Sequence, residues 1–180
     1  MNRLRELDVR IWIAGLIVVV IVAAGAIALL DGGDSDEGSP GEAVALSESE
    51  LVGEAGALSH PAYWVGPRPG TTSYELTSTP DGRIYIRYLT GDAQAGDPQP
   101  DYLTIGTYTV PGARQALRKA SREGSEKVSQ HGGYEVLNGG GGSNAYVVFD
   151  DEPDLQVEVF SPEPGEAAEL AASGSLKPLG

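Results

Sequence analysis

The sequence contains no cysteine, only two histidines and few basic residues. Without cysteine the chain can form no disulfide, thiolate metal site or cysteine nucleophile, and it cannot carry a bacterial lipoprotein anchor, which needs a cysteine. Lysine and arginine number 12 against 26 aspartates and glutamates, giving a net charge of −14. Such an acidic chain is repelled by nucleic acid and by anionic lipid surfaces. We therefore expect no nucleic-acid partner.

Local motifs for catalysis are also absent. His60 and His131 have no partner at the spacing of a metal or catalytic pair, and each lies in a predicted loop, which favours a structural role. The chain has no Gly-x-Ser-x-Gly or Ser-x-x-Lys motif. The glycine-rich stretch 139–144 lacks the strand-to-helix context of a phosphate loop. The sequence predicts no catalytic residue and no cofactor, although residues distant in sequence can form an enzyme site without leaving a motif.

One long uncharged stretch is present, from Ile11 to Leu30. Its twenty residues correspond to a helix of roughly 30 Å, enough to cross the hydrocarbon core of a bilayer. Trp12 stands at one end, where indole rings prefer the membrane interface. The stretch predicts a single membrane-spanning helix.

The flanking charges predict the orientation of this span. Arg3, Arg5 and Arg10 precede it, so the positive-inside rule places residues 1–10 in the cytoplasm and the rest of the chain outside the cytoplasmic membrane. The alternative is a cleaved signal peptide with Ala26-Ile27-Ala28 as the cleavage site. A signal peptide has an apolar region of only about 7–15 residues, which favours an uncleaved anchor.

The remaining chain divides into a linker at 31–46 and a domain at 47–180. The linker is rich in Gly, Ser and acidic residues and predicts a disordered stalk. In the domain, Ser47 and Glu50 have the spacing of a capping box. The expected elements are helices at 48–58, 111–124 and 162–172, and strands at 73–78, 83–89, 102–110, near 128, 134–137, 145–149 and 155–160. The turns between strands are short.

This order predicts an α+β domain: a two-layer sandwich of mostly antiparallel sheet with about three helices on one covered face. With one N-terminal span and a small acidic domain outside, the chain resembles in layout the bacterial proteins with a membrane-anchored ectodomain. The resemblance covers the architecture and implies no site residue.

Three groups of residues are candidates for binding. The loop from Asp150 to Asp154 holds four carboxylates in five residues, so Asp150, Asp151 and Asp154 are candidate metal ligands. The loop lacks the Asp-x-Asp-x-Asp-Gly spacing of calcium loops, which favours a solvated hairpin tip.

The second group is Arg114, Arg118, Lys119 and Arg122 on the polar side of the second predicted helix. This side is either a solvated face paired with nearby acids, which we favour, or a docking site for an anionic partner.

The third group is Tyr63, Trp64 and Arg68, in a stretch with two prolines and two glycines. Aromatic residues with an arginine recur at binding hot spots, but a tryptophan that fills the core beneath the first helix is the favoured interpretation.

We therefore expect a non-enzymatic binding or accessory module of the bacterial cell envelope, with a protein or envelope partner. The alternative is an envelope enzyme, a carboxylate- or metal-dependent hydrolase. A concave pocket lined by two carboxylates, or by a carboxylate and a histidine, would favour the enzyme. A flat exposed patch around Trp64, or none, would favour the binding module.

Overall fold

The computed structural model describes residues 43–124, 128–139 and 142–180. The predicted cytoplasmic tail, the span 11–30 and most of the predicted linker lie outside these residues. None of the described helices is long and apolar enough to cross a membrane.

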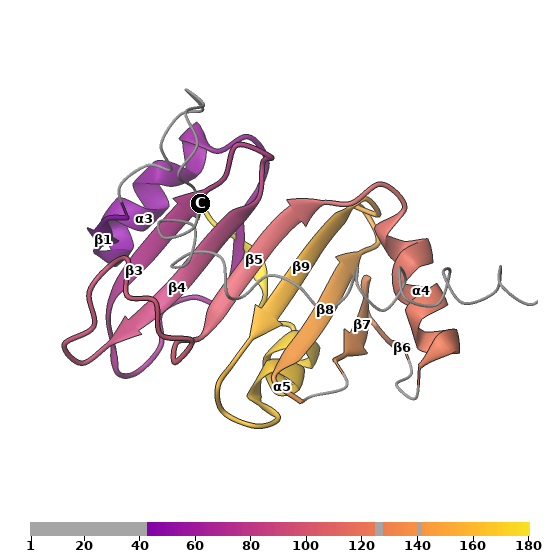
Figure 1. The fold of residues 1–180 in the computed structure, drawn as a ribbon. Coiled ribbons are helices and arrows are strands. Elements are labelled where there is room, and N and C mark those ends of the chain that lie inside the picture. Colours follow the sequence, from indigo (N-terminus) through magenta and orange to yellow (C-terminus); the bar gives the residue numbers. More distant parts are fainter. Residues whose placement is uncertain (1–42, 125–127, 140–141) are drawn as a thin grey trace, which may run out of the picture.

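Among the described residues, one eight-stranded sheet forms the centre of the domain, and all its neighbouring strands are antiparallel (Figure 1). Across the sheet, the strands are β1 (Ala45–Leu46), β3 (Thr71–Ser78), β4 (Ile84–Thr90), β5 (Thr104–Thr109), β9 (Leu155–Phe160), β8 (Asn144–Phe149), β7 (Tyr134–Asn138) and β6 (Val128–His131). The chain thus builds two meanders, β3–β4–β5 and β6–β7–β8–β9, and the β5–β9 pair joins them. The sheet begins at Ala45, inside the stretch predicted as linker.

Three α-helices surround the sheet in the described residues: α3 (Glu48–Glu54), α4 (Ala113–Glu123) and α5 (Glu166–Ala172). The α+β class and the three helices confirm the sequence prediction. The predicted capping box at α3 is also confirmed, because the Ser47 hydroxyl accepts from the amide of Glu50, whose carboxylate accepts from the amide of Ser47. A short 3₁₀ turn, η2 (Ala55–Ala57), continues α3.

The other two helices begin later than predicted. Gly112 and Gly165 precede α4 and α5 with φ of 71° and 85°, a left-handed conformation that glycine adopts without steric cost. Helical geometry therefore starts after these glycines rather than at Pro111 and Pro162.

The predicted loop 63–70 contains a short strand instead. β2 (Tyr63–Trp64) pairs with β10 (Lys177–Pro178) and forms a separate two-stranded ribbon. Local sequence could not reveal this ribbon, because its two strands come from opposite ends of the domain and each is only two residues long.

The sheet buries side chains on both faces. On the first face, α3, α5 and the β2–β10 ribbon cover a core that includes Leu51, Trp64, Ile86 and Val157. On the second face, α4 packs Ala113 and Leu117 against a separate cluster formed by Leu137, Tyr146 and Val148. The prediction that all helices cover a single face therefore holds for α3 and α5 but is wrong for α4. This helix packs on the opposite face and adds a third layer over β6, β7 and β8.

Candidate functional site

The first two arginines of α4 point toward the sheet. Arg118 makes a two-pronged ion pair with Glu135, whose side chain is 1% exposed, through Nε at 2.8 Å and through Nη2. Arg114 donates from Nη2 to Asp150 Oδ1 at 2.7 Å and to the carbonyl of Phe149 at 2.8 Å, and its Nε lies 3.8 Å from Glu135. These contacts satisfy a buried carboxylate, so both arginines hold α4 against β7 and β8.

Lys119 and Arg122 differ from the other two basic residues of α4. Both are exposed, and neither forms an ion pair within the described residues. The structure thus divides the candidate docking group into two arginines that pair with carboxylates, Arg114 and Arg118, and two exposed residues without an ion pair there.

Trp64 lies in the core with 4% of its surface exposed. Its ring packs edge-on against Tyr74 at 6.1 Å between centroids, and Lys177 Nζ lies 5.5 Å from the ring. Arg68 pairs with Glu166 at the start of α5, with Nη2 and Oε1 2.5 Å apart. These residues connect the β2–β10 ribbon to α5 and the core, so they form no exposed patch around Trp64.

Most carboxylates of the 150–154 loop bind groups of the protein itself. Asp150 pairs with Arg114, Glu152 accepts from the Tyr63 hydroxyl at 2.8 Å, and Asp154 accepts from the Gly112 amide at 2.7 Å. No three metal-binding side chains gather into a cluster within the described residues. Asp151 is exposed and makes no ion pair there.

Both histidines contact neighbouring groups. The ring nitrogens of His60 face the carbonyls of Pro61 at 3.0 Å and Gly82 at 2.6 Å, which ties the end of the α3 segment to the β3–β4 turn. His131 stacks on Tyr134 with 5.0 Å between ring centroids.

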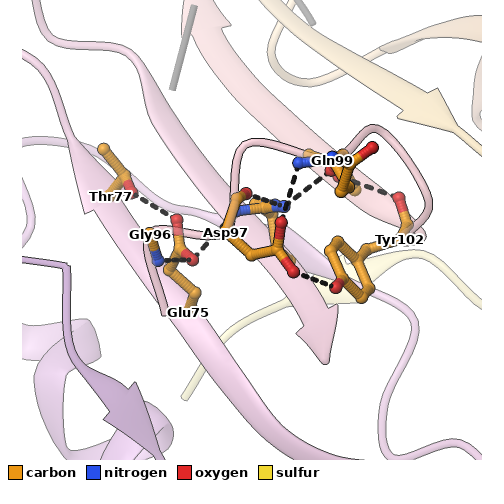
Figure 2. A network of polar contacts seen from close by, with 8 residues as sticks. Glu75, Thr77, Gly96, Asp97, Gln99 and Tyr102 are labelled. Atoms are coloured by element: carbon orange, nitrogen blue, oxygen red, sulfur yellow. Dashed lines mark hydrogen bonds and ion pairs between the residues drawn. The ribbon is translucent and has the colours of Figure 1, made fainter. Parts of the chain in front are cut away.

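A buried ion pair on the second face of the sheet holds the acidic loop between β4 and β5. Glu75 and Arg87, paired across β3 and β4, are 3.0 Å apart, and the Gly96 amide donates to Glu75 at 2.8 Å. Arg87 donates to the carbonyls of Asp97 and Gln99 at 2.8 and 3.0 Å. Figure 2 shows this loop closing over the Glu75 carboxylate. Because its groups bind one another, the network is structural.

The loop has its own internal contacts. The Gln99 amide and the Tyr102 hydroxyl both donate to the Asp97 carboxylate, which lowers the pKa of Asp97. The Arg87 guanidinium lies 4.8 Å from the Tyr102 ring centroid. The sequence predicted this segment as an acidic loop, and the structure shows why it is ordered.

A third buried carboxylate, Glu158 of β9, lies on the same face. It accepts from the Tyr108 hydroxyl at 2.9 Å and from the Asn144 amide at 2.6 Å, and burial raises the pKa of Glu158. Gly106 stands opposite Glu158, and a Cβ at Gly106 would lie 3.1 Å from the Tyr85 ring. A side chain at this position would therefore require the Tyr85 ring to shift by a few tenths of an ångström.

A cleft of about 470 Å³ opens at the ends of β7 and β8. It lies among the β6–β7 turn, the β8–β9 hairpin and the segment that follows α5, and its lining consists of Gly132, Gly133, Tyr134, Phe149, Asp150, Asp151, Gly174 and Leu176. The Tyr134 hydroxyl donates to the carbonyl of Ala172, which ties the end of α5 to the rim.

Comparisons with known protein families, characterised proteins and solved structures find no match to this chain. The site must therefore be interpreted from its own geometry.

Tyr134 and Phe149 of the cleft lining belong to a row of packed aromatic rings that continues behind the cleft. Tyr63 stacks on Phe149 at 4.5 Å, Phe149 lies 5.6 Å from Tyr134, and Tyr134 stacks on His131 at 5.0 Å. Tyr134 and Phe149 are half-buried, and Asp150 and Asp151 are exposed beside them. The site can thus offer aromatic surface and carboxylate oxygens to a ligand.

Sequence reasoning found only part of this site. It named Asp150 and Asp151, and it assigned Tyr134 and Phe149 correctly to strands, but it gave these two aromatic residues and Gly174 no binding role. The hairpin of β7 and β8 places Tyr134 opposite Phe149, and the packing of the segment after α5 adds Gly174 and Leu176. Local periodicity carries no information about the position of that segment.

Proposed function

We propose that the chain is a membrane-anchored, extracytoplasmic binding module of the bacterial cell envelope, held by residues 11–30 in the cytoplasmic membrane. The observation that carries the proposal is the cleft beside the 150–154 loop. Ligand sites are concave and combine apolar or aromatic walls with a few polar groups, which is the composition of this lining. The lining contains no serine, threonine, lysine or histidine, so acid–base chemistry at this cleft would depend on the carboxylates of Asp150 and Asp151. By the criteria drawn from the sequence, the buried Trp64 favours a binding module, whereas the two carboxylates of the cleft favour the enzyme considered below.

Crosslinking and co-purification from membranes of the native host test the proposal. We expect one or more envelope components to be captured by the wild-type chain and lost with Gly132→Trp, which places a large side chain at the cleft wall. Gly132 has no neighbour within 4 Å of a built Cβ and no positive φ, so the substitution is compatible with the fold. Gly53→Trp on exposed α3 is the matched control, because its Cβ also meets nothing. Equal capture by all three proteins would refute a role for the cleft.

The orientation of the anchor is tested separately. A reporter that is active only outside the cytoplasm, fused after Gly180, should be active, because three arginines precede the span. Activity of a cytoplasmic reporter at the same position would contradict the proposed topology.

A second candidate function is an envelope hydrolase, and one observation favours it: two adjacent carboxylates, Asp150 and Asp151, line the cleft. The Arg114 contact occupies one oxygen of Asp150, which leaves Asp151 as the general base of such an enzyme. Glycosidic, ester and peptide reporter substrates test this alternative. Turnover that Asp151→Asn abolishes, with stability unchanged, would establish the enzyme and displace the binding module.

A further inference from the structure

We infer that the cleft beside the 150–154 loop binds an organic cation, an amine or guanidinium group carried on an apolar stem. This inference rests on the proposed function and names the ligand class of the same site. It follows from the size of the cleft, its aromatic wall, its charge and its glycines.

The size of the cleft selects an organic group. Its volume of about 470 Å³ lies within the roughly 300–1,000 Å³ of typical ligand sites and is far larger than a bare metal ion requires. Three of its lining residues are glycines, Gly132, Gly133 and Gly174. A Cβ built on Gly132 or Gly133 meets no atom within 4 Å, so the space they leave is open to a ligand.

The aromatic wall selects a cation. The face of an aromatic ring carries a negative partial charge and attracts ammonium and guanidinium groups within about 6 Å of the ring centroid. Tyr134 and Phe149 are held in place by stacking on His131 and Tyr63 and are only half-buried, so they keep surface toward the cleft. Leu176, in the segment after α5, adds an apolar side chain to the lining that the apolar stem of the ligand can contact.

The charge of the lining points to the same ligand. It includes two carboxylates and no lysine or arginine. Arg114 neutralises Asp150 at 2.7 Å, whereas Asp151 has no ion pair within the described residues, so Asp151 is the anion left for a ligand. The net charge of −14 adds a field that attracts cations and repels anions.

Such a cation has two sources, a lysine or arginine side chain of a partner protein and a free organic amine. The test uses the full chain in detergent micelles, labelled with ¹⁵N, and follows the amide signals of Gly132, Gly133 and Asp151. The probes are Nα-acetyl-lysine methylamide, Nα-acetyl-arginine methylamide and free n-pentylamine. Nα-acetyl-norleucine methylamide, which has the stem of lysine without its charge, is the control.

We expect the cationic probes to shift these amide signals and to bind about five- to tenfold more tightly than the norleucine probe, weakening as salt is added. Tighter binding of the two amino-acid probes than of pentylamine would identify a protein side chain as the source, and the reverse order would identify a free amine. Equal binding of the lysine and norleucine probes, or shifts confined to residues away from the cleft, would overturn the inference.

Matched variants complete the test. Asp151→Asn should weaken the cationic probes about fivefold and leave the norleucine probe unchanged, while Asp92→Asn, an exposed acid on another loop, should change neither. Gly132→Trp should abolish binding and Gly53→Trp should not. Capture of an envelope partner that depends on Gly132, without cation binding, would leave the proposed function standing and refute only the cation. Cation binding without any captured partner would support the cation site and would refute an envelope component as the ligand of the cleft.

Discussion

Removal of Arg87 should be among the most destabilising single changes in this domain. Arg87→Met removes the 3.0 Å contact with Glu75 and two hydrogen bonds to the carbonyls of Asp97 and Gln99. Glu75 is 1% exposed and would keep the Gly96 amide at 2.8 Å and a long contact with Thr77 at 3.5 Å. A buried carboxylate that loses its cation costs about 3–5 kcal/mol, so we expect a loss of that size.

The partner substitution should cost less. In Glu75→Gln the amide oxygen still accepts from Gly96, and Arg87 keeps its two carbonyl acceptors, so the expected loss is about 1.5–3 kcal/mol. The double variant Glu75→Leu with Arg87→Met leaves no buried charge. Because the freed loop groups return to water, it should be more stable than Arg87→Met alone.

Urea unfolding, followed by circular dichroism and fitted to two states, measures these differences. Arg83→Met is the control, since Arg83 pairs with Asp81 at the surface and such pairs contribute about 0–1 kcal/mol. This role of the ion pair is refuted if the unfolding free energy of Arg87→Met lies within about 1 kcal/mol of wild type and is no lower than that of the double variant. The ion pair would then not hold the loop.

Three further predictions follow from the polar contacts and the edge of the sheet. Replacing Arg114 and Arg118 by Gln should lower the melting temperature measured at low salt, because the buried carboxylate of β7 loses both cations, while Arg122→Gln should leave it unchanged. The pKa of Glu158 is higher in the folded state than in the unfolded state, so the folded state binds the proton more tightly. The unfolding free energy of wild type, measured relative to Glu158→Gln, should therefore rise as the pH falls from 7 through the raised pKa. It should level off below about 4.3, the ordinary pKa of Glu. A soluble fragment that begins before β1 should unfold cooperatively in calorimetry, with or without chelator. Its melting temperature should exceed that of a fragment that begins at Ser47, because β1 pairs with the edge of β3.

The elements that the sequence predicted correctly are those with a local cause. Ile84, Ile86 and Tyr88 alternate with Tyr85 and Arg87, and this period of two placed the β3–β4 hairpin and assigned its faces. The capping box of α3 is likewise set by residues three positions apart.

The features that the sequence did not reveal depend on contacts between distant segments. Tyr63 and Trp64 form a strand only because Lys177 and Pro178 lie beside them. The arginines of α4 repeat every fourth residue, and that spacing is the same for a docking face and for a face that pairs with a buried acid. Only the packing of α4 on the face of β7 that carries Glu135 separates the two.

The seam between β5 and β9 also has a consequence for the folding rate. Thr104 pairs with Phe160 and Thr109 with Leu155, so the chain segment closed into a loop by this pairing contains all of α4, β6, β7 and β8. Strands so far apart in sequence lose conformational entropy when the long loop between them closes, before their contacts stabilise the fold. Such pairings therefore slow folding. We expect each meander to form early and the seam to complete the transition state. Substitutions at Ile105 or Val157 should therefore slow refolding, whereas substitutions at the outer strands should mainly speed unfolding.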